Sequence, residues 1–144
     1  DLIIEKLTLM YSSVFREVAA AKSIFEKLDA YILAHLKFVE KNTNFCRIFL
    51  RGENELSPLT MDSLRERLKE DYLDSLARME DIIKTGIKKR LLRNLTPRDI
   101  ATTLSHLVLG CAEDWLTIDA QGSLVSKKDM ILDIFLNGVK KHEV

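Results

Sequence analysis

The stretch MDSLRERLKEDYLDSLARMEDIIKTGIKKRL, from Met61 to Leu91, decides the fold. Its apolar residues recur every three or four positions, and charged residues fill most positions between them. This spacing indicates a helix of about 3.6 residues per turn rather than a strand, whose side chains alternate with period two. We therefore predict one long helix that buries a single face. Its apolar stripe consists of Met61, Leu64, Leu68, Tyr72, Leu76, Met79, Ile83, Ile87 and Leu91.

Capping motifs mark the starts of other helices. In a capping box, a Ser or Thr accepts a hydrogen bond from the amide three residues on, where an acidic side chain reaches back. Residues 23–26 meet this pattern, and residues 96–99 and 126–129 are weaker versions with Asp in place of Glu. Gly86 is expected to bend or end the long helix. We predict helices over residues 2–22, 24–40, 43–52, 60–93, 97–119 and 127–141.

Length and composition indicate one helical domain. A chain of 144 residues can bury roughly two-thirds of its unfolded surface in one core. Only two prolines and five glycines interrupt it, and no stretch has the pattern of a strand, a repeat or a linker. We therefore expect an all-α protein, an antiparallel bundle of about six helices that occupies residues 1–144 as one domain.

Charge and hydropathy restrict the partners. The net charge is zero, so no overall field draws the chain to nucleic acid or to an anionic membrane. Cys46 and Cys111 lie far apart in apolar stretches, which is typical of buried free thiols in a reducing compartment. No apolar run approaches the roughly 18 residues of a membrane span, and residues 1–6 do not resemble a signal peptide. We expect a soluble, cytoplasmic protein without a membrane partner; a start at Asp1 suggests a trimmed or partial chain.

The last two predicted helices have the broadest apolar faces. Apolar residues between positions 100 and 116 cover about 200° of the helix circumference, twice what one packing contact needs. Such faces would leave a large exposed patch on a monomer. We therefore predict that the two helices form a homodimer interface, in which glycines permit close backbone approach. The predicted interface residues are Leu104, Leu109, Gly110, Leu116, Ile131, Ile134, Phe135 and Gly138.

One histidine falls within an apolar helix face. His35 lies in the middle of the apolar arc of helix 24–40, one turn after Tyr31, so we expect its imidazole to be buried. The plain interpretation is a core histidine that pairs with a backbone carbonyl or a water. The functional alternative makes His35 and Tyr31 the polar anchor of an apolar ligand pocket. Further candidates for the pocket wall, for which core packing is also an explanation, are Phe45, Phe49, Tyr72, Cys111 and Trp115.

Two stretches resemble the C-terminal domain of TetR/AcrR-family transcriptional regulators. They are LDAYILAHLKFVEKNTNFCRIFL, from Leu28 to Leu50, and GIKKRLLRNLTPRDIATTLSHLVLGCAEDWLT, from Gly86 to Thr117. The resemblance implies a ligand-binding and dimerisation domain of a regulator, expected to be a repressor that senses a small apolar effector. The family's helix-turn-helix headpiece is absent, and the opening DLIIEKLTLMYSSVF resembles the helix that follows it. Operator DNA would then be bound only through the missing headpieces, one from each copy of the dimer. The ligand would change the spacing between these two headpieces.

Catalytic motifs are missing from the sequence. It contains no HExxH, GxSxG or Walker-type loop, no Glu-x-x-His pair, and no His beside either cysteine. We therefore expect neither an enzyme nor a cofactor. The alternative to a ligand sensor is a helical protein–protein interaction module that binds no small molecule.

The stretch 84–98 holds six basic residues and no acidic one. Basic residues near a helix C-terminus are favoured by the helix dipole and by solvation, so a phosphate site is the less favoured interpretation. His106 lies on the polar side of its helix, where contact with solvent or with a dimer partner suits it better than a pocket.

Overall fold

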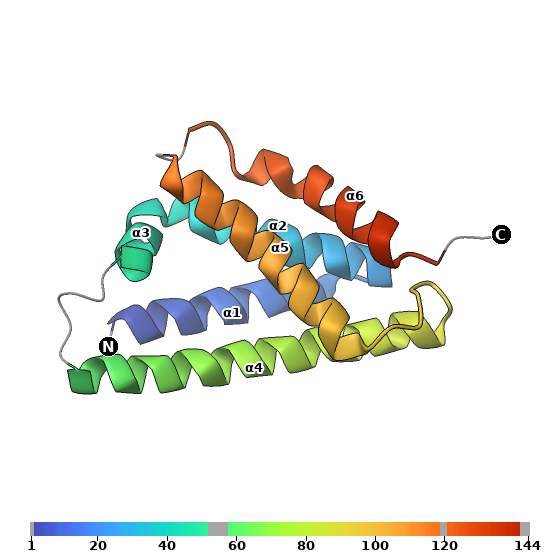
Figure 1. Cartoon of the computed structure of the whole chain (residues 1–144), viewed down its shortest axis with the longest axis horizontal. Helices are drawn as coiled ribbons and strands as arrows, with labels where there is room; N and C mark the ends of the chain where they lie inside the picture. Colours follow the sequence, from blue (N-terminus) through green and yellow to red (C-terminus); the bar gives the residue numbers. More distant parts are fainter. Residues whose placement is uncertain (1, 52–57, 119–120, 142–144) are drawn as a thin grey trace.

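Helices make up all the regular secondary structure of the described residues (Figure 1). The structure, a computed structural model, describes residues 2–51, 58–118 and 121–141, with side chains there except at 48–51 and 58–61. The all-α prediction is confirmed for this part of the chain, and each expected helix is present. The elements are α1 (Leu2–Ala20), α2 (Ile24–Lys41), α3 (Thr43–Arg51), α4 (Pro58–Lys88), α5 (Pro97–Thr117), the 3-10 helix η2 (Val125–Lys127) and α6 (Lys128–Val139).

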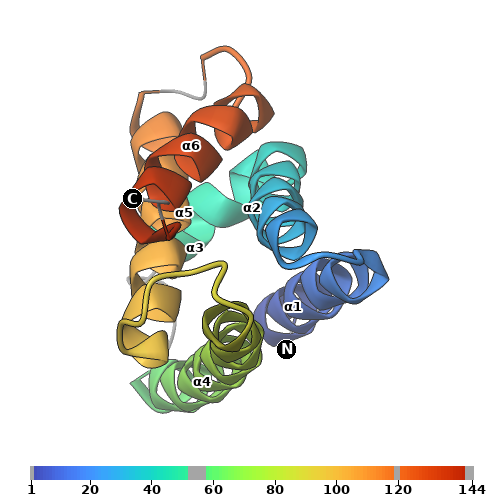
Figure 2. The same ribbon diagram turned by 90° about the vertical axis from the view of Figure 1, so that its right-hand side faces the viewer.

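Helix α2 is the common packing partner of the bundle. It contacts α1, α3, α4, α5 and α6, and its residues Leu28, Ile32 and Leu36 are fully buried. Figure 2 shows α1, α2, α4 and α5 arranged around a shared interior, with α3 behind it. Because α2 meets neighbours on several sides, any side chain on its apolar arc, His35 included, faces the interior of the bundle.

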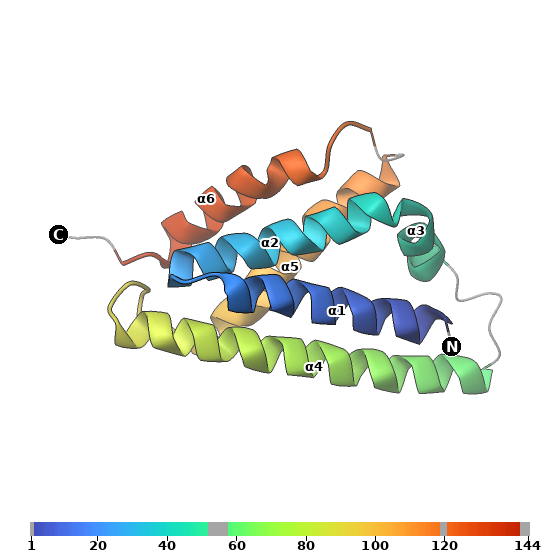
Figure 3. The ribbon, with the colours of Figure 1, turned by 180° about the vertical axis from the view of Figure 1, so that it is seen from behind.

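The helices are not all antiparallel. Neighbours along the chain, such as α1 with α2 and α4 with α5, run in opposite directions, as expected (Figure 3). Helices α1 and α4 run in the same direction, since Thr8 contacts Arg67 and Phe15 contacts Arg78 further along both helices. Figure 1 shows that α4 begins at the end of the bundle where α1 begins and where α3 lies.

Helix α4 ends earlier than predicted. It continues through Gly86 but stops at residue 88 rather than 93. Arg90 adopts a left-handed backbone with φ 60°, and the Leu91 amide donates to the Gly86 carbonyl at 2.9 Å. The chain then folds back on the helix, so that a Cβ atom on Gly86 would lie 2.7 Å from Leu92 Cδ1. Gly86 therefore serves close packing and does not break the helix.

The connection between α4 and α5 is fastened to the end of α6. Arg93 donates from its backbone amide to the Val139 carbonyl and from Nη1 to the Gly138 carbonyl, both at 2.7 Å. Leu92 and Lys140 form an isolated antiparallel bridge beside these bonds. These contacts fix the C-terminal end of α6 against the turn where α5 begins, and α5 and α6 lie together on one side of the bundle (Figure 2).

One of the three predicted capping boxes has the expected bond. The Ser23 hydroxyl accepts from the Glu26 amide at 3.1 Å. Thr96 stands at the N-cap of α5, but its side chain makes no capping bond. The prediction for Ser126 is wrong, because this residue lies in η2 and its amide donates to the Ser123 hydroxyl. Helix α6 therefore starts at residue 128, without a side-chain cap.

Candidate functional site

Polar side chains from three helices meet in the interior of the bundle. On α2, the rings of Tyr31 and His35 lie 4.4 Å apart between centroids. The Tyr31 hydroxyl is hydrogen-bonded by Ser75 of α4 and Ser105 of α5. Ser75 and Tyr31 are both buried. Tyr31 therefore ties α2 to both helices through its hydroxyl.

The ring of His35 is held in one tautomer. Its Nδ1 atom lies 2.8 Å from the Tyr31 carbonyl oxygen, one turn earlier on α2. A carbonyl only accepts hydrogen bonds, so Nδ1 carries the proton and Nε2 is an acceptor. Burial lowers the pKa of His35, and the ring is neutral at pH 7. This carbonyl bond is the one that the plain interpretation of a core histidine requires.

Helix α1 adds Tyr11 to this polar cluster. Its ring lies 6.4 Å from the His35 ring in an edge-on arrangement. Burial, with smaller contributions from the nearby Tyr31, Asp71 and Tyr72, raises the pKa of Tyr11 to about 12. Sequence analysis missed Tyr11, although it shares an i, i+3, i+4 stripe with buried residues of α1. Its phenol stays protonated at neutral pH.

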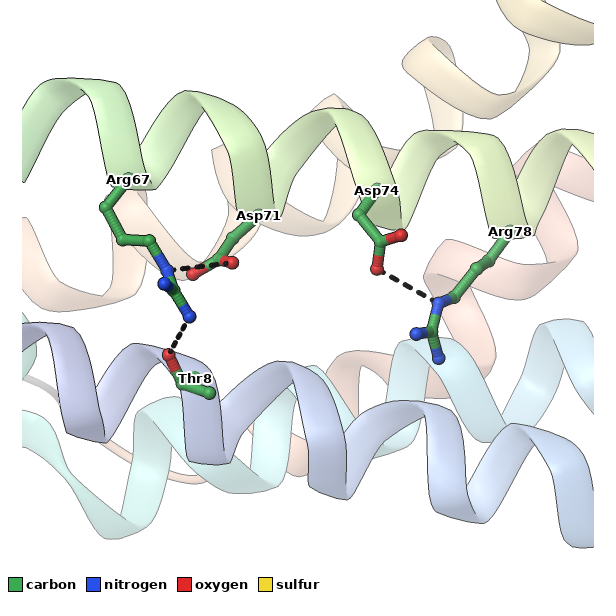
Figure 4. A network of polar contacts seen from close by, with 5 residues as sticks. All are labelled: Thr8, Arg67, Asp71, Asp74 and Arg78. Carbon is green, nitrogen blue, oxygen red and sulfur yellow. Dashed lines mark hydrogen bonds and ion pairs between the residues drawn. The ribbon is translucent and has the colours of Figure 1, made fainter.

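Asp71 of α4 lies where this cluster meets α1 (Figure 4). One carboxylate oxygen, Oδ1, is 3.4 Å from Arg67 Nε, and Arg67 in turn donates from Nη2 to the Thr8 hydroxyl at 3.3 Å. The other oxygen, Oδ2, is buried and has no hydrogen-bond partner among the described residues. By contrast, Asp74 one turn later pairs with Arg78 in an exposed position. Asp71 therefore presents one unsatisfied acceptor inside the protein.

The predicted pocket residues divide into two groups. Tyr31 and His35 form part of the cluster, and Tyr72 of α4 lies beside it, where it contributes to the raised pKa values of Tyr31 and Tyr11. The Tyr72 ring packs edge-on against His106 of α5, with 6.5 Å between ring centroids. Phe45 lies elsewhere: its ring packs edge-on against Phe38 of α2 at 6.4 Å and lies under the ammonium of Lys6 at 5.5 Å. Phe49 is on α3, but its side chain lies outside the described residues.

Trp115 and Cys111 occupy the C-terminal half of α5. Trp115 is buried, and its indole nitrogen donates to the Gln121 carbonyl at 3.1 Å. Cys111 is partly buried and packs against the hydrophobic core. Helix α3, which carries Phe45, also packs on α5. These three residues therefore line the core near α3, separate from the polar cluster.

The predicted dimer residues also fall into two sets. Leu109 and Ile134 expose 52% and 56% of their surface, and a Cβ atom added at Gly110 or Gly138 would meet no atom within 4 Å. These four residues are exposed on α5 and α6. The other four are buried within the single chain: Leu104, Leu116, Ile131 and Phe135.

A groove is lined in part by two of these exposed residues, Ile134 and Gly138. It has a volume of about 550 Å³ and lies between the first half of α5 and the second half of α6. A shallower hollow of about 450 Å³ adjoins it on α5, where His106 and Leu107 form part of the wall. The groove is lined by Leu95, Thr96, Asp99, Ile100, Thr103, Leu107, Ile134, Phe135, Gly138 and Val139.

The basic stretch after α4 has a structural partner. The Arg93 guanidinium donates to the Gly138 carbonyl near the C-terminus of α6, where a helix dipole favours positive charge. In the described parts of the chain, no three His, Cys, Asp or Glu side chains are grouped to hold a metal ion. No helix there is long and apolar enough to cross a membrane.

The arrangement of the helices is the fold seen in TetR/AcrR-family transcriptional regulators. Among solved structures, FadR from Bacillus subtilis in complex with stearoyl-CoA matches with a TM-score of 0.78 and 20% identity, over 95% of this chain and 72% of that one. The ketosteroid regulator KstR2 of Mycobacterium tuberculosis matches with a TM-score of 0.71 and 15% identity, over 95% and 68%.

A TetR/AcrR-family regulator from Thermobifida fusca matches with a TM-score of 0.61 and 21% identity, over 94% of this chain and 68% of that one. No family model matches the sequence, and no curated protein matches it significantly. At these identities the likeness establishes the fold that this chain shares with the regulators.

Proposed function

We propose that residues 1–144 are the effector-sensing and dimerisation domain of a ligand-responsive transcriptional regulator of the TetR/AcrR type, a cytoplasmic repressor and not an enzyme. The observation that carries this proposal is the match of nearly the whole helical arrangement to such regulators, of which this chain spans about 70%. The remaining part of each regulator leaves room for a headpiece. DNA would be bound there, and not by this domain, whose net charge is zero.

The effector binds in the interior surrounded by α1, α2, α4 and α5. Core residues of these helices give it an apolar wall, and the cluster around His35 supplies the few polar groups that orient a ligand. Two neighbours support an effector with an extended apolar part: one was solved in complex with stearoyl-CoA, and another is a ketosteroid transcriptional regulator. We therefore expect a small, largely apolar effector.

A titration followed through Trp115 tests the ligand. Trp115 is the only tryptophan and is buried on α5, which forms part of the interior. Fatty acyl and aromatic compounds should quench its fluorescence and raise the melting temperature. A ligand at 100 times its dissociation constant stabilises the folded state by about 2.7 kcal/mol. If no compound does either, the helical interaction module becomes the better proposal.

A matched pair of variants locates the site. Tyr72 is partly buried beside the polar cluster, whereas its neighbour Leu73 is 41% exposed on α4. Tyr72→Ala should weaken effector binding about tenfold or more, because it removes a ring from the pocket wall. Leu73→Ala should leave binding unchanged. Equal effects of the two changes would place the ligand elsewhere.

The link to DNA has its own test. By this proposal the coding sequence upstream of Asp1 specifies a helix-turn-helix, and two copies hold their headpieces at the spacing of an operator. If that sequence specifies no helix-turn-helix, the regulator proposal fails. If it does, the full protein should bind operator DNA, and the effector found above should weaken that binding.

A further inference from the structure

We propose that Asp71 anchors the effector by accepting a hydrogen bond from a neutral donor, so that the effector is an apolar molecule with a hydroxyl group at one end. This inference rests on the proposed function and adds the chemical class of the polar end. It concerns one atom, the carboxylate oxygen Oδ2, which the contacts within the chain leave without a partner.

The geometry of Asp71 leaves this oxygen available to a ligand. Arg67 Nε lies 3.4 Å from the other oxygen, Oδ1, and Arg67 Nη2 donates to the Thr8 hydroxyl of α1 at 3.3 Å (Figure 4). These two contacts fix the carboxylate on the Oδ1 side. Oδ2 itself is buried and has no hydrogen-bond partner among the described residues, although 18% of the Asp71 side chain is exposed. Buried polar atoms in native proteins nearly always have a partner, and an unpaired carboxylate oxygen is among the most costly. A donor that arrives with the effector supplies the missing bond.

The charges around Asp71 select a neutral donor. Its negative charge is already matched by Arg67, so a cationic ligand would leave an excess positive charge in the interior. An anionic ligand would be repelled by the carboxylate and would find no free cation among the cluster residues, because His35 is neutral and Tyr11 is protonated. Burying an unmatched charge is strongly unfavourable in either case. A hydroxyl avoids both costs.

The neighbouring groups complement a hydroxyl. The charge of Asp71 acts on the Tyr11 phenol, which places the two groups near each other. A ligand hydroxyl can donate to Asp71 and accept from Tyr11, while its apolar body lies along the core residues of α2 and α4. An ether of the same shape can accept from Tyr11 but cannot donate. The difference between an alcohol and its methyl ether therefore isolates the bond to Asp71.

The experiment compares three probes of equal chain length through Trp115 fluorescence: 1-dodecanol, dodecyl methyl ether and dodecanoate, with the hexadecyl series alongside. The alcohol should bind about tenfold or more tightly than the ether, since a hydrogen bond to a charged group is lost in the ether. Dodecanoate should bind more weakly than the alcohol. Asp71→Ala should bring the alcohol and ether to equal affinity, because no acceptor remains.

Asp74→Ala is the matched control. Asp74 lies on the same helix but is exposed and pairs only with Arg78, so this variant should keep the preference for alcohol. The preference is a ratio measured within one variant, so a change of overall stability does not imitate the result. If Asp71→Ala does not fold, the isosteric variant Asp71→Asn is measured in its place. It should also lose most of the preference for the alcohol over the ether, because the asparagine amide can donate a hydrogen bond to the ether oxygen.

The outcomes separate this inference from the function on which it rests. If the native protein binds the ether or dodecanoate as tightly as the alcohol, or if the preference survives in the Asp71 variants, the anchor is not Asp71. The proposed apolar effector site stands in that case. If no probe of either length quenches Trp115 or raises the melting temperature, the effector site itself is refuted, and the anchor with it.

Discussion

His35 shows how one buried side chain links stability to pH. Burial disfavours the imidazolium, while the bond from Nδ1 to the Tyr31 carbonyl opposes this effect only in part. The folded protein therefore binds a proton at His35 less readily than the unfolded chain does. Below the unfolded pKa of about 6.5, the unfolded state carries a proton that the folded state lacks, so acid favours unfolding.

The free energy of unfolding should fall as the pH drops below about 6.5, by up to about 1.4 kcal/mol per pH unit from His35 alone. His35→Gln should remove this part of the slope, because glutamine does not titrate. Urea unfolding between pH 5.5 and pH 8 measures both slopes. An unchanged slope in His35→Gln would mean that the ring is protonated in the folded state.

At the scale of a helix, the end of α4 depends on an unusual residue. The Arg90 amide donates to the Ile87 carbonyl, and the Leu91 amide donates to the Gly86 carbonyl, both at 2.9 Å. These two bonds define a Schellman motif, in which the residue with positive φ is usually glycine. Here that residue is Arg90, at φ 60°. The sequence therefore lacks the usual stop signal, which is why the predicted helix ran to residue 93.

Arg90→Gly should stabilise the protein by roughly 0.5–1 kcal/mol, because it relieves the contact between Cβ and the backbone in the left-handed conformation. Lys89→Gly is the control next to it: Lys89 has no positive φ, so glycine there should be neutral or destabilising. Thermal and urea unfolding of the two variants give the comparison. A destabilised Arg90→Gly would show that the arginine side chain contributes more than its backbone costs.

At the scale of the whole molecule, the predicted dimer residues that remain exposed in one chain are Leu109, Gly110, Ile134 and Gly138. An apolar groove of about 550 Å³ between α5 and α6 is lined in part by two of them, Ile134 and Gly138. Close approach of two copies is sterically open at both glycines. We therefore expect a symmetric dimer in which α5 and α6 of each copy pack against those of the other.

Ile134→Asp should convert this dimer into a monomer. In a symmetric dimer both copies contribute residue 134 to the interface, so the substitution would bury two unpaired charges there. Light scattering at tens of micromolar gives the mass. Leu73→Asp introduces the same charge at an exposed leucine on α4 and should leave the dimer intact. Gly110→Trp should also loosen the dimer. A native chain that is monomeric at this concentration would contradict the proposed interface.

Local patterns determined the helices and the central position of His35. Apolar residues spaced by threes and fours specify a helix and its buried face, whatever the position of that helix in the fold. In the same way, the apolar residues on both sides of His35 on its helix predict that the histidine faces the core. The same local information predicted Tyr31 and His35 as one pair, because they lie one turn apart on the same helix, and Tyr72 as a separate candidate. The further members of the cluster, Tyr11 and Asp71, come from α1 and α4, which are distant in sequence.

Only the tertiary structure decided which apolar residues are buried by contacts within the chain and which stay exposed, available to a partner. Leu104 and Leu109 are alike in sequence, yet the first is fully buried and the second half exposed. The parallel pairing of α1 and α4 likewise brings Thr8, Arg67 and Asp71 together and leaves one oxygen of Asp71 unpaired. Hydropathy specifies that a face is to be buried, but the partner that buries it depends on contacts between distant segments.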